Sequence, residues 1–152
     1  MNATAAHPST SNRRPVVVLS TSAETGKLLL RVLLGALVLL HGIAKVQNGV
    51  GPIADMLAKA GVPGGVAYLA YVGEVLAPLL LIVGLWTRPA ALVVAFNMVV
   101  ALVLVHKAQI LTLNAQGGWG IELQAMYLFG AIAVALLGAG RYSIGGYDAR
   151  WN

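Results

Sequence analysis

The chain has 152 residues, of which 59% are hydrophobic and only 10% are charged, and its mean hydropathy is +0.81. Soluble domains carry about 25% charged residues, and a domain this small leaves much of its surface outside the core. The composition therefore excludes an ordinary soluble fold and indicates that lipid surrounds most of the chain. The net charge of +5 is interpreted through the positions of the Lys and Arg residues, which bear on membrane orientation. We expect no nucleic-acid partner. Because the sequence has no cysteine, disulfides, thiol catalysis, cysteine-ligated iron–sulfur clusters and covalently attached c-type haem are excluded.

Four apolar runs are long enough to cross a bilayer as helices, which takes about 20 residues each. They cover approximately residues 28–46, 66–86, 89–105 and 121–138. A membrane β-barrel would alternate polar and apolar residues in segments of about 10, whereas these runs are continuous and rich in Ala and Leu. The sequence predicts an all-α integral membrane four-helix bundle, with residues 27–141 as the transmembrane domain.

The segments outside the spans are two tails and the connections between helices. Residues 1–26 are polar and rich in Ser and Thr, which predicts a disordered N-terminal tail, and residues 142–152 form a short C-terminal tail. After the first span, a short amphipathic helix is expected because its apolar residues recur at helical spacing: Ile53, Met56, Leu57 and Ala60. This helix is too short to span, so it lies flat on the membrane surface or between helix ends.

The Lys and Arg residues decide the predicted orientation. Four spans place both termini on one side of the membrane, together with Arg13, Arg14, Lys27, Arg31, Arg88, Arg141 and Arg150. The opposite side has only Lys45, Lys59 and Lys107. The pattern predicts a multi-pass protein of the bacterial inner (plasma) membrane with both termini in the cytoplasm. Arg31 and Arg88 are interpreted as cytoplasmic anchors of their spans.

Glu74 lies well inside the second apolar run. It shares a helix face with small residues at positions 67, 70, 77 and 84 and with Leu81, and small residues let membrane helices approach closely. Glu74 is therefore predicted to point into the bundle. Pro78 has no N–H to bond the carbonyl of residue 74, and an unpaired carbonyl in hydrocarbon is costly. An acid inside a membrane is a functional candidate by default, although a neutral, hydrogen-bonded helix clamp is the alternative.

His41, His106 and Glu122 lie near the outer ends of their spans and are expected to face one cavity together with Glu74, while Asn97 lies deeper. Glu74 and His41 are the candidate catalytic residues, and the candidate substrate-binding residues are Lys45, Asn97, His106 and Glu122. Simpler structural roles remain open, because polar side chains at span ends can reach the interface and an asparagine can join two helices. No metal site is predicted, because the two histidines and two carboxylates form no local H-x-x-x-H or E-x-x-H motif.

Several stretches resemble the DoxX family of small four-helix membrane proteins. They are HGIAKV at 41–46, the GVPGG-to-AAL run at 61–92, VH at 105–106, GGWGIELQAMYL at 117–128 and GAGRYSIGGYD at 138–148. The resemblance implies a four-helix fold and points to His41, Lys45, Glu74, Arg88, His106 and Glu122. The family's name implies respiratory electron transfer, and its founding relatives are membrane subunits associated with quinone-linked oxidation. The long N-terminal tail and Pro78 depart from the family pattern.

The favoured function is a membrane subunit of a redox system that handles quinone-like or small oxidisable molecules. In this function His41 hydrogen-bonds a quinone carbonyl and Glu74 relays protons. Burial can in general raise the pKa of a carboxylic acid toward neutral pH, as proton transfer requires. A quinone is the one cofactor considered, and electrons would come from a redox partner protein. The alternatives are a proton-coupled transporter or resistance factor, which would need a homo-oligomer, and a non-catalytic scaffold that docks a partner at the bilayer.

Overall fold

The computed structural model describes residues 20–146 and 149–152, and these ranges are helical with no extended strand. A long helix, α1 (Thr21–Asn48), comes first and is followed by a short helix, α2 (Gly51–Lys59). The second span is composite and is made of η1 (Gly64–Tyr68), α3 (Leu69–Tyr71), η2 (Val72–Leu76) and α4 (Ala77–Val83). The last elements are α5 (Thr87–Leu104), the short 3-10 helix η3 (Lys107–Gln109) and α6 (Glu122–Leu137). This arrangement confirms the predicted all-α fold.

Three of these helices are long and apolar enough to cross a membrane: α1 with 28 residues, the composite helix from Gly64 to Val83 with 20, and α5 with 18. The fourth predicted span corresponds to α6, an apolar helix of 16 residues. At a rise of about 1.5 Å per residue α6 is about 24 Å long, which is shorter than the hydrocarbon core of a typical bilayer, about 30 Å. The described part of the chain therefore has three helices suited to spanning a membrane and one shorter apolar helix.

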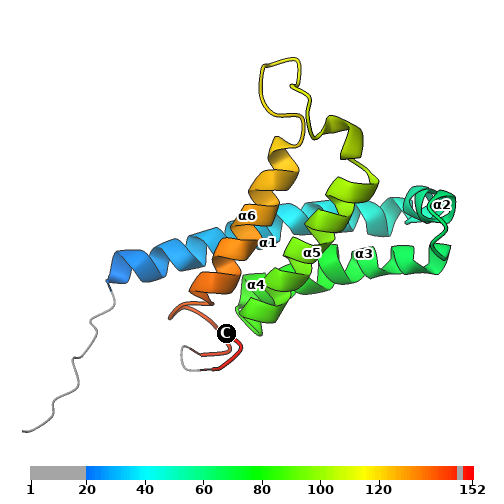
Figure 1. Cartoon of the computed structure of the whole chain (residues 1–152). Helices are drawn as coiled ribbons and strands as arrows, with labels where there is room; N and C mark the ends of the chain where they lie inside the picture. Colours follow the sequence, from blue (N-terminus) through cyan, green and yellow to red (C-terminus); the bar gives the residue numbers. More distant parts are fainter. Residues whose placement is uncertain (1–19, 147–148) are drawn as a thin grey trace, which may run out of the picture.

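The helices form two pairs that cross one another (Figure 1). In this view α1 runs beside the composite second span, while α5 and α6 pass across that pair. The core where the four meet is built from small and branched side chains of every helix: Leu34, Val38, Ala77, Leu81, Ala91, Val94, Met98, Ala131 and Val134. The Ala residues at the crossings allow the close approach that the sequence of the second span predicts.

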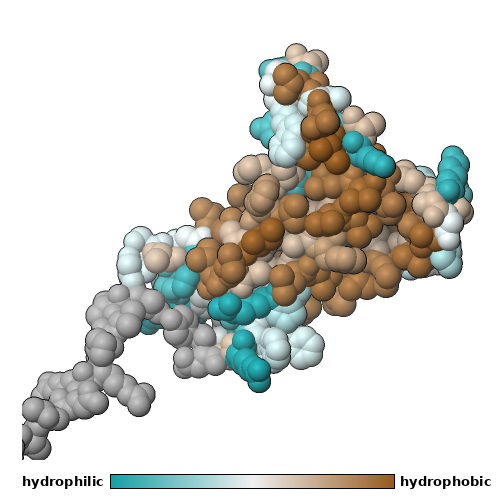
Figure 2. All heavy atoms as spheres, in the orientation of Figure 1, coloured by the Kyte–Doolittle hydropathy of each residue, from teal (hydrophilic) through white to brown (hydrophobic). Residues whose placement is uncertain are grey.

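The outer surface of the helices is apolar, as lipid contact requires. On the face shown in Figure 2, hydrophobic residues form a continuous region over the helices, and hydrophilic residues gather at the chain's turns and ends. Large apolar side chains such as Leu29, Leu40, Phe96 and Leu136 are between 62% and 73% exposed. Four aromatic residues near the ends of the spans are also exposed, as is usual at a membrane interface: Tyr68, Trp86, Trp119 and Tyr142.

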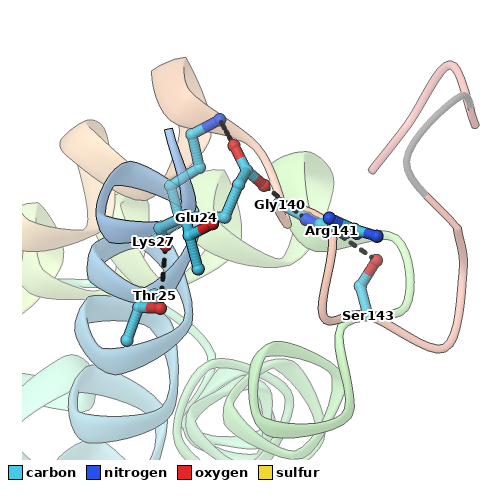
Figure 3. A network of polar contacts seen from close by, with 7 residues as sticks. Glu24, Thr25, Lys27, Gly140, Arg141 and Ser143 are labelled. Atoms are coloured by element: carbon cyan, nitrogen blue, oxygen red, sulfur yellow. Dashed lines mark hydrogen bonds and ion pairs between the residues drawn. The ribbon is translucent and has the colours of Figure 1, made fainter. Parts of the chain in front are cut away.

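Helix α1 begins at Thr21, seven residues before the predicted first span and inside the predicted tail of residues 1–26. Glu24 in its first turn explains the early start. The Glu24 carboxylate accepts bonds from Lys27 Nζ at 2.7 Å and from the Arg141 backbone N–H at 2.6 Å (Figure 3). These contacts tie the first turn to the segment after α6, so the helix extends beyond its apolar stretch. Residues 1–19 of the predicted tail lie outside the described residues.

The two arginines interpreted as anchors cap helices instead. Arg31 is 1% exposed and donates from Nη1 to the carbonyls of Leu81 at 2.8 Å and Ile82 at 3.2 Å. Arg88 donates to the carbonyls of Ala135 and Leu136 at the end of α6. The last carbonyls of a helix have no helical donor, and a cation there complements the helix dipole. Both arginines therefore stabilise helix C-termini, and Arg31 is buried inside the bundle.

Candidate functional site

The second span changes its helical geometry at Glu74. Residues Val72–Leu76 form a π-helical turn, in which the N–H of Ala77 bonds the carbonyl of Val72, five residues earlier. The following Pro78 cannot donate to the carbonyl of Glu74, so the regular α-helical pattern cannot continue through this point. Single π-turns within helices are frequent at functional sites. The break places Glu74 on the buried face of the helix.

Glycines bring the neighbouring helices close to this turn. Gly42 of α1 lies against the Glu74 carbonyl so closely that a Cβ atom at this position would overlap the carbonyl oxygen. On the other side, a Cβ atom at Gly73 would lie 2.6 Å from Cγ of Asn97 on α5. Both contacts are too short for any side chain larger than hydrogen. Glu74 is therefore enclosed between α1 and α5, as its predicted helix face requires.

Both oxygens of the Glu74 carboxylate have partners. Lys45 Nζ forms an ion pair with Oε2, and Asn97 Nδ2 donates to Oε1 at 3.0 Å. Glu74 is only 4% exposed, whereas the Lys45 side chain is 28% exposed. Side chains on a helix lean toward its N-terminus, so Lys45, near the outer end of α1, reaches inward to Glu74. We call these three residues the polar cluster.

The polar cluster forms one end of an open groove with a volume of about 440 Å³. The remaining wall is apolar and comes from three elements: Ile53, Met56 and Leu57 of α2, Val66, Ala67, Leu69, Ala70, Val72 and Gly73 of the second span, and Val93, Phe96, Val100, Ala101, Leu104 and Val105 of α5 and its end. An apolar pocket with a few convergent polar groups is the usual form of a small-molecule site. The groove is therefore the candidate functional site.

Helix α2 closes the outer end of this groove. Leu57 is buried against Val50 and Ala67, with Ile53 and Leu104 beside them. Asp55 and Lys59 on the other side of α2 are exposed. The predicted amphipathic helix therefore exists, and of its two predicted positions it takes the one between helix ends.

Of the four residues predicted to share a cavity, only Glu74 lines the groove. His41 is exposed on α1, and its ring contacts the edge of Tyr127 on α6 at a centroid distance of 5.8 Å. His106 bonds two amides outside the groove, with Nδ1 at 2.8 Å from Gln109 Oε1 and Nε2 at 3.0 Å from Gln124 Nε2. Glu122 is exposed at the start of α6. His41, His106 and Glu122 therefore do not share this groove with Glu74.

The catalytic and binding roles of the predicted residues stay predictions, but their grouping is now defined. Lys45, Glu74 and Asn97 lie together, and His41, His106 and Glu122 lie elsewhere. Sequence reasoning placed Lys45 and Glu74 on facing helices without pairing them. The inward lean of a helical lysine is the signal that could have predicted the pair. Among the described residues, no three His, Asp or Glu side chains are grouped as a metal site requires.

The sequence model of DoxX matches residues 26–107, more than half of the chain. This chain belongs to the DoxX family. The groove and its polar cluster lie entirely within the matched range of this DoxX protein. Over 121 residues it is 30% identical to a protein of Bacillus subtilis (strain 168) named "Putative oxidoreductase CatD", covering 80% of this chain and 85% of the relative. No solved structure matches the chain.

Proposed function

We propose that this DoxX-family protein is a membrane subunit of a redox system and that it binds a quinone-like molecule in the groove. The observation that carries the proposal is the joining of a long apolar groove to a buried polar cluster at one end. A quinone has the matching form, because its ring and substituents are apolar and its carbonyl oxygens accept hydrogen bonds. The name of the Bacillus subtilis relative, an oxidoreductase, supports the same class.

In this proposal Lys45 is the group that contacts the quinone. Its ammonium has three N–H donors, of which one bonds Glu74, and its partial exposure in the groove leaves another for a ring carbonyl. Glu74 pairs with Lys45, and Asn97 holds the carboxylate in place. Lys45 thus takes the hydrogen-bonding role that the sequence assigned to His41, whose ring faces Tyr127.

The redox step needs an electron donor outside this chain. Reduction of a quinone to a quinol takes two electrons and two protons, and we assign the electrons to a reduced partner protein. The protons would reach the two ring oxygens through the Lys45–Glu74 pair. The chain has no cysteine, so cysteine-ligated iron–sulfur clusters and thiols in this subunit cannot be the source.

The membrane and orientation are part of the same proposal. We place the protein in the bacterial inner membrane with both termini in the cytoplasm, because most Lys and Arg residues belong to the side that holds the termini: Lys27, Arg31, Arg88, Arg141 and Arg150. This places the polar cluster nearer the outer face. A redox partner or a second copy of the chain would bind in the membrane or at either surface.

Quinone binding by the purified full-length chain in phosphatidylcholine vesicles tests the proposal. Binding of a ubiquinone ring is followed by quenching of tryptophan fluorescence. Loss of a hydrogen bond from a charged group costs about 1.5–3 kcal/mol, so Lys45→Met should weaken binding about tenfold or more. Lys59→Met, an exposed lysine of α2 outside the groove, should bind like the parent.

The double variant Lys45→Met/Glu74→Gln guards against misfolding, because it removes both charges together. It should remain folded and should also bind weakly. The proposal fails if the parent shows no saturable quenching, or if folded variants without Lys45 bind as tightly as the parent.

A proton-coupled transporter is the second candidate, and the broken second span favours it. Discontinuous helices are typical of secondary transporter sites, and the π-turn at Glu74 interrupts the regular α-helix of the second span. Uptake of a labelled solute into the same vesicles, driven by a pH gradient and lost in Glu74→Gln, would support this candidate. Quinone reduction with no such uptake would exclude it.

A further inference from the structure

The side chains around the mouth of the groove are apolar and lie within the membrane-spanning helices. On the second span these are Val66, Leu69 and Val72, and on α5 they are Val93 and Phe96. Their exposed fractions run from 37% for Val93 to 69% for Phe96. Exposed apolar residues within spans contact hydrocarbon, so the mouth between the second span and α5 faces lipid.

The route from water to the polar cluster is apolar as well. Helix α2 covers the outer end of the groove with Ile53, Met56 and Leu57, and Leu104 and Val105 of the other wall meet them there. A charged solute from the aqueous side would lose its hydration along this wall before it reached Lys45. Transfer of an unpaired charge into apolar surroundings is strongly unfavourable, so this wall selects against charged, water-borne ligands.

Two small residues line the groove beside the polar cluster, and we call them the passage. Ala70 lies one helical turn outward from Glu74, and Ala101 lies one turn outward from Asn97. Both line the groove, Ala70 from the second span and Ala101 from α5. Their methyl groups leave room beside the polar cluster that larger side chains would fill. A flat ring, or a ring with an attached chain, can therefore lie over the two alanines with its polar end at Lys45.

The polar end has a defined charge. The Lys45–Glu74 pair is formally neutral, so it offers no net charge to a charged ligand. What remains available in the groove is donor capacity on Lys45 and the second N–H of Asn97 Nδ2, whose other N–H bonds Glu74. An uncharged head group with an oxygen acceptor fits this arrangement.

We propose that the groove takes its ligand sideways from the bilayer, and that the ligand is an uncharged lipid-soluble molecule with an oxygen acceptor in its head. This inference rests on the proposed function and specifies its substrate class and its route of entry. The head binds at Lys45 and Asn97, the body lies over Ala70 and Ala101, and any chain extends through the mouth beside Leu69 and Phe96.

Decylubiquinone in vesicles of the full-length protein tests the route. A ligand that arrives from the bilayer has a half-saturation point set by its mole ratio to lipid, so the total ligand required should rise in proportion when lipid is added. A sulfonated naphthoquinone, which stays in water because of its charge, should neither bind nor compete.

Narrowing the passage gives a second, structural test. Ala101→Phe and Ala70→Phe should each weaken decylubiquinone binding about tenfold or more, because a phenyl ring fills the space over the alanines. Ala36→Phe is the matched control, since Ala36 is exposed on α1 and does not line the groove. Circular dichroism and gel filtration identify any variant that misfolds. If one of the two phenylalanine variants misfolds, binding by the other one tests the route.

The outcomes separate the inference from the proposed function. Two results would overturn the bilayer route and leave the quinone function intact. One is binding of the sulfonated quinone that depends on Lys45, and the other is decylubiquinone binding that is unchanged in Ala70→Phe and Ala101→Phe. Absence of binding by every quinone overturns both.

Discussion

Gly42 of α1 lies directly against the backbone carbonyl of Glu74, with no room for a methyl group between them. This is the carbonyl that Pro78, without an N–H, cannot bond. The contact therefore joins three features of the sequence: a glycine in the first span, an acid in the second, and a proline one turn later. It fixes the depth at which Lys45, one turn beyond Gly42, meets the Glu74 side chain.

Substitution of Gly42 should destabilise the bundle. A methyl group in Gly42→Ala would overlap the Glu74 carbonyl and push the two helices apart, and overpacking of this kind costs about 1–3 kcal/mol. Thermal unfolding in detergent, followed by circular dichroism, measures the change. Gly26→Ala is the control, because a methyl group there meets nothing within 4 Å, and the change should stabilise α1 by up to about 1 kcal/mol. Equal behaviour of the two variants would show that the close contact does not exist.

The ion pair should respond asymmetrically to loss of either partner. Lys45→Met leaves the buried Glu74 carboxylate without its cation, and breaking a buried pair costs about 3–5 kcal/mol. Glu74→Gln leaves Lys45, whose side chain is 28% exposed, free to turn toward the mouth of the groove and should cost less.

A double-mutant cycle checks this prediction. The variant Lys45→Met/Glu74→Gln should be more stable than Lys45→Met alone, and the coupling between the two sites should exceed about 1 kcal/mol. Denaturation in detergent measures all four proteins. Additive effects, or a more damaging Glu74→Gln, would contradict the pairing seen in the structure.

Much of the fold follows from the sequence because lipid imposes a simple rule. Backbone groups in hydrocarbon must bond within their own segment, so each long apolar run becomes a helix near its predicted bounds. The small-residue face of the second span also predicts its packing, since Ala67, Glu74, Ala77 and Leu81 are all buried. Local composition is enough for both conclusions.

The sequence did not predict which polar residues lie together in the folded chain. His41 and Lys45 are four residues apart and share a face of α1, yet His41 contacts Tyr127 while Lys45 reaches Glu74. The choice depends on where α6 crosses α1 and on the position of α2, which are both tertiary features. Arg31 is similar, because only the folded chain brings the carbonyls of Leu81 and Tyr142 to a residue that composition marks as an anchor.

Arg31 should matter for stability far more than an exposed arginine. Arg31→Gln removes donors to the carbonyls of Leu81 and Tyr142, at 2.8 Å and 2.6 Å, which would then be left unpaired. Each such bond contributes about 1.5–3 kcal/mol, so we expect a loss of about 3 kcal/mol or more in detergent unfolding.

Arg141→Gln is the matched control for Arg31. The Arg141 side chain is exposed, and its contact with Glu24 is made by the backbone N–H, which the substitution keeps. This variant should stay within about 0.5 kcal/mol of the parent. Comparable losses in the two variants would mean that charge on this side of the membrane, and not helix capping by Arg31, sets stability.

The orientation can be measured directly because the chain has no native cysteine. Single cysteines are placed at Ser22, in the first turn of α1, and at Gln116, in the exposed loop between α5 and α6. The excess of Lys and Arg at the N-terminal side predicts that this side faces the cytoplasm. A membrane-impermeant maleimide should therefore label Gln116→Cys in intact spheroplasts and Ser22→Cys only after permeabilisation, while the cysteine-free parent stays unlabelled. The reverse pattern would invert the orientation, and labelling of both sites from outside would mean that an odd number of spans does not separate them.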